Sequence, residues 1–218
     1  MSRTRACFVQ PARFFVAWQG VLTLAFAGFP PQLAQLKRAL TTDIVPLAEN
    51  PGSKWPKATL GCLKEGARLT PAQLDALLRV CNEYSTHLTT AAKLHVTQLH
   101  IVLFRCRSLE RVFSRSALAL ASPPDTAPPD DAALADVAAV AAEADVVSAY
   151  WFHVSKDGQR ESHYRGDASG ATLVAPLTRK CIDLWRLDDF RKAVDAELGP
   201  MYRWLADDSL HMTIRALL

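Results

Sequence analysis

The stretch that decides the fold runs from Trp55 to Leu78 and reads WPKATLGCLKEGARLTPAQLDALL. Residues 57–63 have the short, turn-bounded pattern of a β-strand. Thr70 and Pro71 are typical of the N-cap and the first residue of a helix. An apolar face on that helix is supplied by Leu74, Leu77, Leu78 and Cys81. The segment therefore predicts a strand, a turn and a Leu-rich helix.

Strand and helix patterns alternate outward from this segment. Strands are predicted at 14–27 (a buried strand or hairpin arm), 94–104, 146–154, 171–177 and 210–218. Helices are predicted near 33–40 and over 187–205, the second broken at Gly199-Pro200. Each half of the chain runs strand, helix, strand, so we expect an α+β fold with two similar halves and mostly antiparallel pairing.

The chain has 218 residues, half of them hydrophobic and 22% charged, which is enough apolar material for a folded core. We expect one domain over residues 14–218, preceded by a loose arm at 1–13. Ala, Pro and Asp dominate residues 117–145, which predicts a flexible insertion with a weak Ala-rich helix near 132–144.

Charge, cysteine usage and hydropathy exclude several classes of protein. The net charge of +3 is too small for a polybasic protein. The five cysteines form no CxxC pair, which argues against a disulfide framework or a zinc ribbon and favours free thiols. No run of 18 apolar residues is present, so we expect no membrane partner.

The N-terminal region leaves the compartment open. The apolar stretch at 14–29 follows several arginines, and the first acidic residue is Asp43. A targeting signal has such a composition, but the strand-like run at 21–26 favours a structural role. We expect a cytoplasmic protein, with an organelle as the alternative.

The C-terminal tail holds the first pattern with chemical content. Side chains alternate along a strand, so His211 and Thr213 share one face while Met212 and Ile214 point to the other. A hydroxyl can donate to a phosphate oxygen, and an imidazole can transfer a proton near neutral pH. Lys57 and Thr59 share a strand face in the same way.

Together these two segments resemble the two-histidine (2H) phosphoesterases, the LigT-like group, which carry two H-x-T/S motifs on central strands. Residues 57–78 look like the family's first motif with its Leu-Gly strand end and Leu-rich helix, and Lys57 stands at the histidine position. His211-Met212-Thr213 looks like the second motif, which follows a long helix. The resemblance covers residues 14–218 in outline and implies a bilobal, pseudo-twofold α+β fold with two small sheets flanked by helices.

The resemblance implies a metal-independent phosphoesterase acting on an RNA-type phosphodiester or a 2′,3′-cyclic phosphate, with no cofactor. His211 would be the remaining acid or base, and Thr59 and Thr213 would hold phosphate oxygens. An ordinary lysine has a pKa of about 10.4 and is a poor base at neutral pH. Lys57 would therefore weaken catalysis, unless burial lowered its pKa.

A literal HxT also occurs at His95-Val96-Thr97, and it is a rival for the first motif. The spacing from His95 to His211 is shorter, but no helix is predicted directly after it. Context favours Lys57.

Binding residues for an RNA end or nucleotide are predicted around these motifs. Trp55, in a Pro-bounded loop beside Lys57, is the candidate for stacking on a base. Arg105 and Arg107 are expected to share a strand face, and with Arg215 they could line a groove for phosphate.

Two alternatives to the enzyme remain open. One is a non-catalytic member of the fold that binds nucleotide or RNA, and the other is a protein-interaction module whose insertion recruits a partner. The sequence leaves the oligomeric state open.

Overall fold

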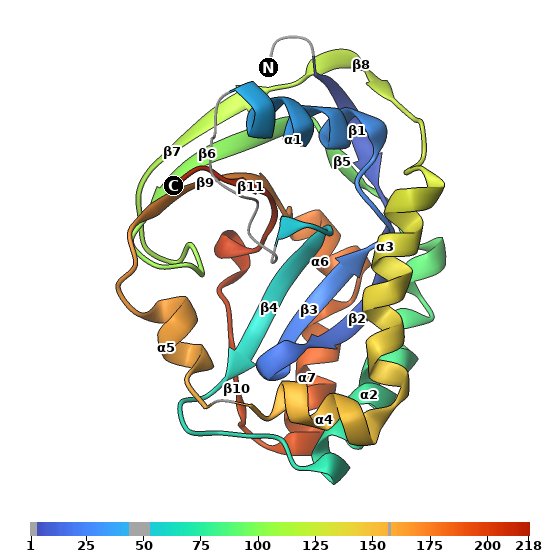
Figure 1. Ribbon diagram of the computed structural model, residues 1–218, viewed down its shortest axis with the longest axis vertical. Coiled ribbons are helices and arrows are strands. Elements are labelled where there is room, and N and C mark those ends of the chain that lie inside the picture. The colour runs from blue at the N-terminus through green and yellow to red at the C-terminus, as the bar shows by residue number, and fades with distance from the viewer. Residues whose placement is uncertain (1–3, 44–52, 157) are drawn as a thin grey trace.

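Two β-sheets organise the α+β fold in the computed structural model, which describes residues 4–43, 53–156 and 158–218 (Figure 1). The large sheet has the order β2-β3-β4-β11-β9-β6-β7, with β10 paired to β4 beyond that path, and its pairs are antiparallel. Its strands are β2 (Pro11–Ala17), β3 (Val21–Phe26), β4 (Lys57–Leu63), β6 (Gln98–Phe104), β7 (Val112–Ala119), β9 (Gly170–Pro176), β10 (Tyr202–Trp204) and β11 (His211–Ala216). The mixed class and the mostly antiparallel pairing predicted from the sequence are confirmed.

The small sheet corrects the expectation of a loose N-terminal arm. It has the order β5-β1-β8, formed by β1 (Arg5–Val9), β5 (Leu94–Val96) and β8 (Ala121–Asp125). β1 pairs antiparallel with β5 and parallel with β8. Because Cys7 and Val9 are buried in the core, and β1 is paired with β5 on one side and with β8 on the other, this part of the arm is an ordered strand.

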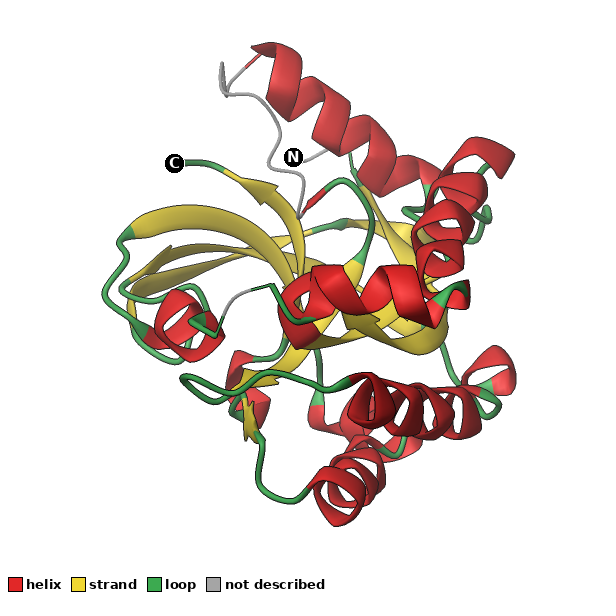
Figure 2. Cartoon of the chain, turned by 60° about the horizontal axis from the view of Figure 1, so that its bottom comes forward, coloured by secondary structure: helices red, strands yellow, loops and turns green. Residues whose placement is uncertain are grey.

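Seven helices of the described chain surround the large sheet, which is strongly curved (Figure 2). They are α1 (Pro31–Asp43), α2 (Pro71–Ser85), α3 (Asp131–Ala142), α4 (Val147–Val154), α5 (Arg160–Arg165), α6 (Arg179–Leu184) and α7 (Leu187–Leu198). In the view of Figure 1, α2 and α7 lie behind β2, β3 and β4, and α3 runs along the β2 edge. None of the described helices combines the length and the apolar character that crossing a bilayer requires.

The strand-turn-helix segment forms as the sequence predicts. β4 spans Lys57–Leu63, and α2 begins at Pro71. The Thr70 hydroxyl accepts from the Gln73 amide, and the Gln73 side chain accepts from the Thr70 amide, which completes a capping box. Gly61 is required where β10 pairs with β4, because an added Cβ would stand 2.8 Å from the Trp204 ring.

The N-terminal apolar stretch forms the hairpin of β2 and β3 in the centre of the core. Phe14, Phe26 and the whole of β3 are buried. Gly20 turns the hairpin with φ of 72°, a left-handed conformation that favours glycine. The predicted structural strand is therefore confirmed for this stretch.

Two segments differ from their predictions. Residues 147–154 form α4 instead of a strand, because Tyr150 and Val154 lie one turn apart and both face the core. A short apolar run does not distinguish a buried strand from a helix by periodicity. In the expected flexible insertion, β8 pairs with β1, and α3 forms at 131–142, close to the predicted Ala-rich helix.

Candidate functional site

The two predicted motifs lie on neighbouring strands of the large sheet. Ala58 of β4 pairs with Met212 of β11 in antiparallel register, and both side chains are fully buried. Their neighbours along each strand therefore point to the opposite face of the sheet. Antiparallel continuation sets Lys57 beside Thr213, and Thr59 beside His211. These four side chains, predicted from positions far apart in the sequence, are thus brought together on one face.

His211 is held in a defined tautomer. Its Nδ1 lies 2.6 Å from the Ser209 carbonyl oxygen, which can only accept, so Nδ1 carries the proton. Nε2 is then the basic nitrogen of the neutral ring. Burial lowers the pKa of His211 below its usual 6.5, against the opposing effect of the Ser209 hydrogen bond. The imidazole is therefore neutral at pH 7 and can accept a proton at Nε2.

Lys57 has an altered pKa as well. Burial, with a contribution from the Lys37 cation, lowers the pKa of Lys57 to about 8. Its ammonium lies 4.1 Å from the centre of the Trp55 ring, a cation–π contact. Lys57 is thus a cation at pH 7 whose proton is far more readily given up than that of an exposed lysine.

Lys37 of α1 is hydrogen-bonded to the backbone beside the two motifs. Its buried ammonium donates to the carbonyl oxygens of Ser53 (2.7 Å) and Ile214 (2.9 Å) and lies over the Phe29 ring. It therefore connects α1 to β11 next to Thr213. The role of Lys37 was not predicted from the sequence.

The hydroxyls of the two motifs have different surroundings. Thr59 is hydrogen-bonded to the side chain of Tyr164 on α5. Thr213 pairs with Val174 of β9, and Val174 pairs in turn with His100 of β6. Since register partners share a face, His100 lies on the same side of the sheet as Thr213.

His100 and Arg115 extend the polar face across the sheet. Neither ring nitrogen of His100 has a hydrogen-bond partner among the described residues. Burial and the nearby Arg115 cation both lower the pKa of His100, and Arg115 also contributes to lowering that of His211. Arg115 therefore acts electrostatically on both imidazoles. Strand alternation through Gln98, His100 and Val102 could have identified His100 from the sequence.

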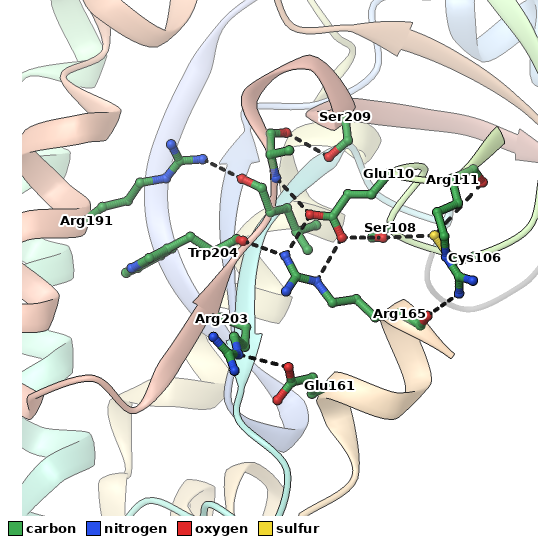
Figure 3. A network of polar contacts seen from close by, with 12 residues as sticks. Cys106, Ser108, Glu110, Arg111, Glu161, Arg165, Arg191, Arg203, Trp204 and Ser209 are labelled. Carbon is green, nitrogen blue, oxygen red and sulfur yellow. Dashed lines mark hydrogen bonds and ion pairs between the residues drawn. The ribbon is translucent and has the colours of Figure 1, made fainter. Parts of the chain in front are cut away.

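A network of polar contacts braces the loop before His211 (Figure 3). The Arg165 guanidinium donates to both oxygens of the Glu110 carboxylate, at 2.7 and 2.8 Å, and to the Trp204 carbonyl oxygen. The same carboxylate accepts from the Ala206 amide and the Ser108 hydroxyl. The network joins α5 to the two loops at 105–111 and 204–210. It holds the chain segment that carries the His211 hydrogen-bond acceptor.

The predicted arginine groove is not formed by Arg105 and Arg107. Both follow the end of β6 in a turn, so they do not share a strand face. The Arg105 guanidinium covers the Phe113 ring at 4.6 Å, and Arg107 Nη1 lies 3.5 Å from His163 Nδ1. Alternation fails here because the strand ends at Phe104, where β6 and β7 already shift register.

Arg215 also differs from its predicted role. A bulge in β11 follows Thr213, and Arg215 then pairs with Leu173, a core residue on the opposite face from Val174. The Arg215 side chain is therefore directed away from Thr213, and it is only 1% exposed. Trp55, by contrast, lies beside Lys57 as expected.

The rival motif lies in a different sheet. His95 is on β5, pairs with Phe8 of β1 and stacks on its ring with centroids 4.5 Å apart. β5 has no pairing with β11. Lys57, and not His95, is therefore the partner of the His211 segment.

A cavity of about 760 Å³ begins at Lys57 and extends over β2 and β3. Its floor includes Phe15 and Thr23, and Tyr164 stands in its wall. Thr23 is the register partner of Thr59, so the cavity and the four motif residues lie on the same face of the sheet. The arrangement is suited to bind an anion and to transfer protons next to a partly apolar chamber.

Metal ligation and cysteine chemistry have little support in the described residues. They hold no group of three or more His, Cys, Asp or Glu side chains close enough to bind a metal. The five cysteines are unpaired and buried, and burial raises the pKa of Cys7, Cys62 and Cys81 to about 12.

Comparison with family models, with curated proteins and with solved structures found no significant match to this chain.

Proposed function

We propose that this protein is a 2H-type phosphoesterase acting on a nucleoside 2′,3′-cyclic phosphate or an RNA-type phosphodiester, with Lys57 in the role of the first histidine. The observation that carries the proposal is the register of Ala58 with Met212. It gathers an ammonium, an imidazole and two hydroxyls on one face of the sheet. Hydrolysis of a phosphodiester requires such groups: hydrogen-bond donors to the phosphate oxygens, one base and one acid.

His211 is the base in this reaction. The neutral ring takes a proton at Nε2 from the attacking water as the water oxygen bonds to phosphorus. The hydrogen bond from Nδ1 to Ser209 supports this role, because it orients the ring and stabilises the imidazolium that forms.

Lys57 is the acid. As the ester bond breaks, its ammonium donates a proton to the leaving 2′ or 3′ oxygen. A pKa of about 8 suits this step, because the group is protonated at pH 7 and still gives up its proton without a large penalty. The imidazolium and the neutral amine then return to their starting states by proton exchange with water.

Thr59 and Thr213 donate to the non-bridging oxygens, and the Lys57 charge stabilises the negative charge that develops there. An antiparallel pair has a local twofold axis. Around Ala58 and Met212, that axis exchanges Lys57 with His211 and Thr59 with Thr213. We extend this symmetry to the fold and propose two related lobes, β2-β3-β4 and β11-β9-β6-β7.

The test is turnover of 2′,3′-cyclic AMP by the purified full chain in the presence of EDTA. We expect hydrolysis that His211→Ala abolishes. The matched control is His95→Ala, an exposed imidazole in the small sheet, and it retains full activity. Absence of turnover by the wild type, or loss in both variants alike, contradicts the enzymatic proposal.

A second candidate function is binding without turnover, and the contact of Lys57 with Trp55 favours it. An ammonium held 4.1 Å over an aromatic ring acts as a fixed cation for a phosphate even when it transfers no proton. Nucleotide binding lost in Lys57→Ala or Thr213→Ala, with no wild-type turnover, would support this function. Neither binding nor turnover, with specific protein capture, would support the interaction module.

A further inference from the structure

The cavity next to Lys57 has walls from parts of the chain far apart in sequence. The floor is the face of β2 and β3, with Phe15, Val21 and Thr23. α3 contributes Asp136 and Val140, and the 3-10 turn after α3 contributes Glu143. Tyr150 of α4 and Tyr164 of α5 complete the wall. The segment expected to be a flexible insertion is thus one side of a chamber.

The chamber is anchored to the sheet on the insertion side. The indole Nε1 of Trp18 donates to the Glu143 carboxylate at 2.8 Å, and the Tyr150 hydroxyl donates to the Val16 carbonyl oxygen. These contacts join the β2–β3 hairpin to the turn after α3 and to α4. The chamber is therefore pre-formed, as small-molecule sites usually are.

Aromatic side chains contribute to every part of the lining named above except α3 and the turn after it, and the volume suits a small organic ligand. Phe15, Trp18, Trp55, Tyr150 and Tyr164 all line a cavity of about 760 Å³. Pockets of roughly 300–1,000 Å³ with apolar walls and a few polar groups are typical of ligand and cofactor sites. Flat aromatic ligands such as nucleobases stack well against such walls.

The charges of the lining are divided between its two sides. Lys54 and Lys57 come from the β4 side, and Arg160 comes from α5. The carboxylates of Asp136 and Glu143 come from α3 and the turn after it, along the β2 edge (Figure 1). An anionic group is attracted to the first side, and N–H donors are attracted to the second.

We propose that this chamber binds the base of a nucleotide whose phosphate lies on the Lys57, Thr59, His211 and Thr213 face. The base is one with an exocyclic amino group, such as adenine, which can donate to the carboxylates from α3 and its following turn. This inference rests on the proposed phosphate site for its orientation. It goes beyond that site by assigning the insertion a role in selecting nucleotides over other phosphate esters.

The experiment measures binding of three probes to the full chain: adenosine 2′-monophosphate, inorganic phosphate and adenosine. The test variant is Val140→Trp, which fills the chamber from α3. The matched control is Ala138→Trp, which places the same side chain at an exposed position of the same helix. Ala17→Phe, from the β2 part of the floor, is a second filling variant in case Val140→Trp does not fold.

We expect the wild type to bind adenosine 2′-monophosphate about 10-fold more tightly than inorganic phosphate, since base stacking on aromatic side chains has roughly that effect. A filling variant removes this preference and leaves phosphate affinity within about 2-fold. Ala138→Trp keeps the preference. Equal binding of nucleotide and phosphate by the wild type, or an unchanged preference in both filled variants, overturns the inference.

Failure of the phosphate site gives a different result. If 2′,3′-cyclic AMP is not hydrolysed and inorganic phosphate does not bind, the proposed function fails. Adenosine binding that the filling variants abolish still supports the chamber as a base site in that case. Hydrolysis of 2′,3′-cyclic AMP without any preference for the nucleotide overturns the chamber and retains the enzyme.

Discussion

Ala58 of β4 and Met212 of β11 are register partners whose buried side chains join the two halves of the large sheet. Every residue of the candidate phosphate site is next to one member of this pair. Because side chains alternate along strands, burying Ala58 and Met212 on one face directs Lys57, Thr59, His211 and Thr213 to the other. The packing of the core therefore arranges the polar groups of the site.

The pH profile of the wild type is the first prediction. The base must be neutral, so kcat/KM for 2′,3′-cyclic AMP rises through the His211 pKa, which lies below 6.5. The acid must be protonated, so kcat/KM falls above the Lys57 pKa of about 8. The result is a bell between these limits. A rate that still increases through pH 9 contradicts the assignment of Lys57 as the acid.

Two replacements of Lys57 test its role as the general acid. Lys57→Met removes the acid and lowers kcat by roughly 10²–10⁴-fold, the usual range for a general acid. Lys57→His restores the two-histidine pattern and moves the alkaline limb of the profile to lower pH, because an imidazole titrates near 6.5. Lys93→Met, an exposed lysine before β5, is the control and leaves both limbs in place. An unchanged alkaline limb in Lys57→His would contradict the prediction.

The hydroxyl of Thr213 is tested by a pair of variants, one that replaces the hydroxyl with a methyl group and one that keeps it. Thr213→Val weakens binding of adenosine 2′-monophosphate about 10- to 100-fold, because a hydrogen bond to a charged oxygen contributes roughly 1.5–3 kcal/mol. Thr213→Ser keeps the hydroxyl and retains most of the affinity. Equal losses in the two variants, measured by calorimetry, would assign the effect to packing instead.

The positive charge of Arg115 affects the pKa of His211. Its cation lowers the His211 pKa, so Arg115→Gln raises that pKa and moves the acidic limb of the pH profile upward. Arg115→Lys keeps the positive charge and leaves the limb near its wild-type position. NMR titration of the His211 ring measures the pKa directly. A downward shift in Arg115→Gln would contradict the electrostatic explanation.

The network around Glu110 predicts acid-dependent stability. Burial raises the pKa of Glu110, but hydrogen bonds from Arg165, Ser108 and the Ala206 amide together hold it below its usual 4.5. Its contribution to the free energy of unfolding is therefore fully present above the unfolded pKa and is lost as the pH falls through the lower folded pKa. Glu110→Gln costs about 1–3 kcal/mol at pH 7, and its deficit shrinks towards pH 3.

Asp167→Asn is the control for this network. Asp167 forms an exposed ion pair with Arg111, and because solvent screens such pairs, Asp167→Asn leaves the free energy of unfolding nearly unchanged at both pH values. Urea unfolding at pH 7 and pH 3 compares the two variants. A deficit in Glu110→Gln that grows as the pH falls would reverse the predicted sign.

Local chemistry made parts of the fold predictable. The strand at 57–63 and the helix start at Pro71 agree with the structure because alternation, the Thr70 cap and the Leu face all act within a few residues. The break of the long C-terminal helix before Gly199-Pro200 was predictable for the same reason. Residues 147–154 were assigned wrongly because a buried helix and a buried strand both appear as apolar runs.

For the candidate site, the sequence predicted four of the residues but not how they are placed relative to one another. His211, Thr213, Lys57 and Thr59 follow from strand phase together with the family resemblance. His100, Arg115 and Lys37 were missed, because their roles depend on strands β6 and β7 and on helix α1 reaching the same region. Arg215 was placed wrongly because a bulge after Thr213 reverses its face.

The sequence by itself determined which residues form the central strand, where helix α2 begins and that Lys57 shares a strand face with Thr59, as His211 does with Thr213. These features follow from periodicity and capping over short distances. Only the tertiary structure decided that β4 lies beside β11, that Lys57 is buried enough to lower its pKa to about 8, and that α3 covers a chamber over β2 and β3. Strand register, desolvation and cavity shape depend on contacts between segments distant in the chain, and no local pattern specifies them.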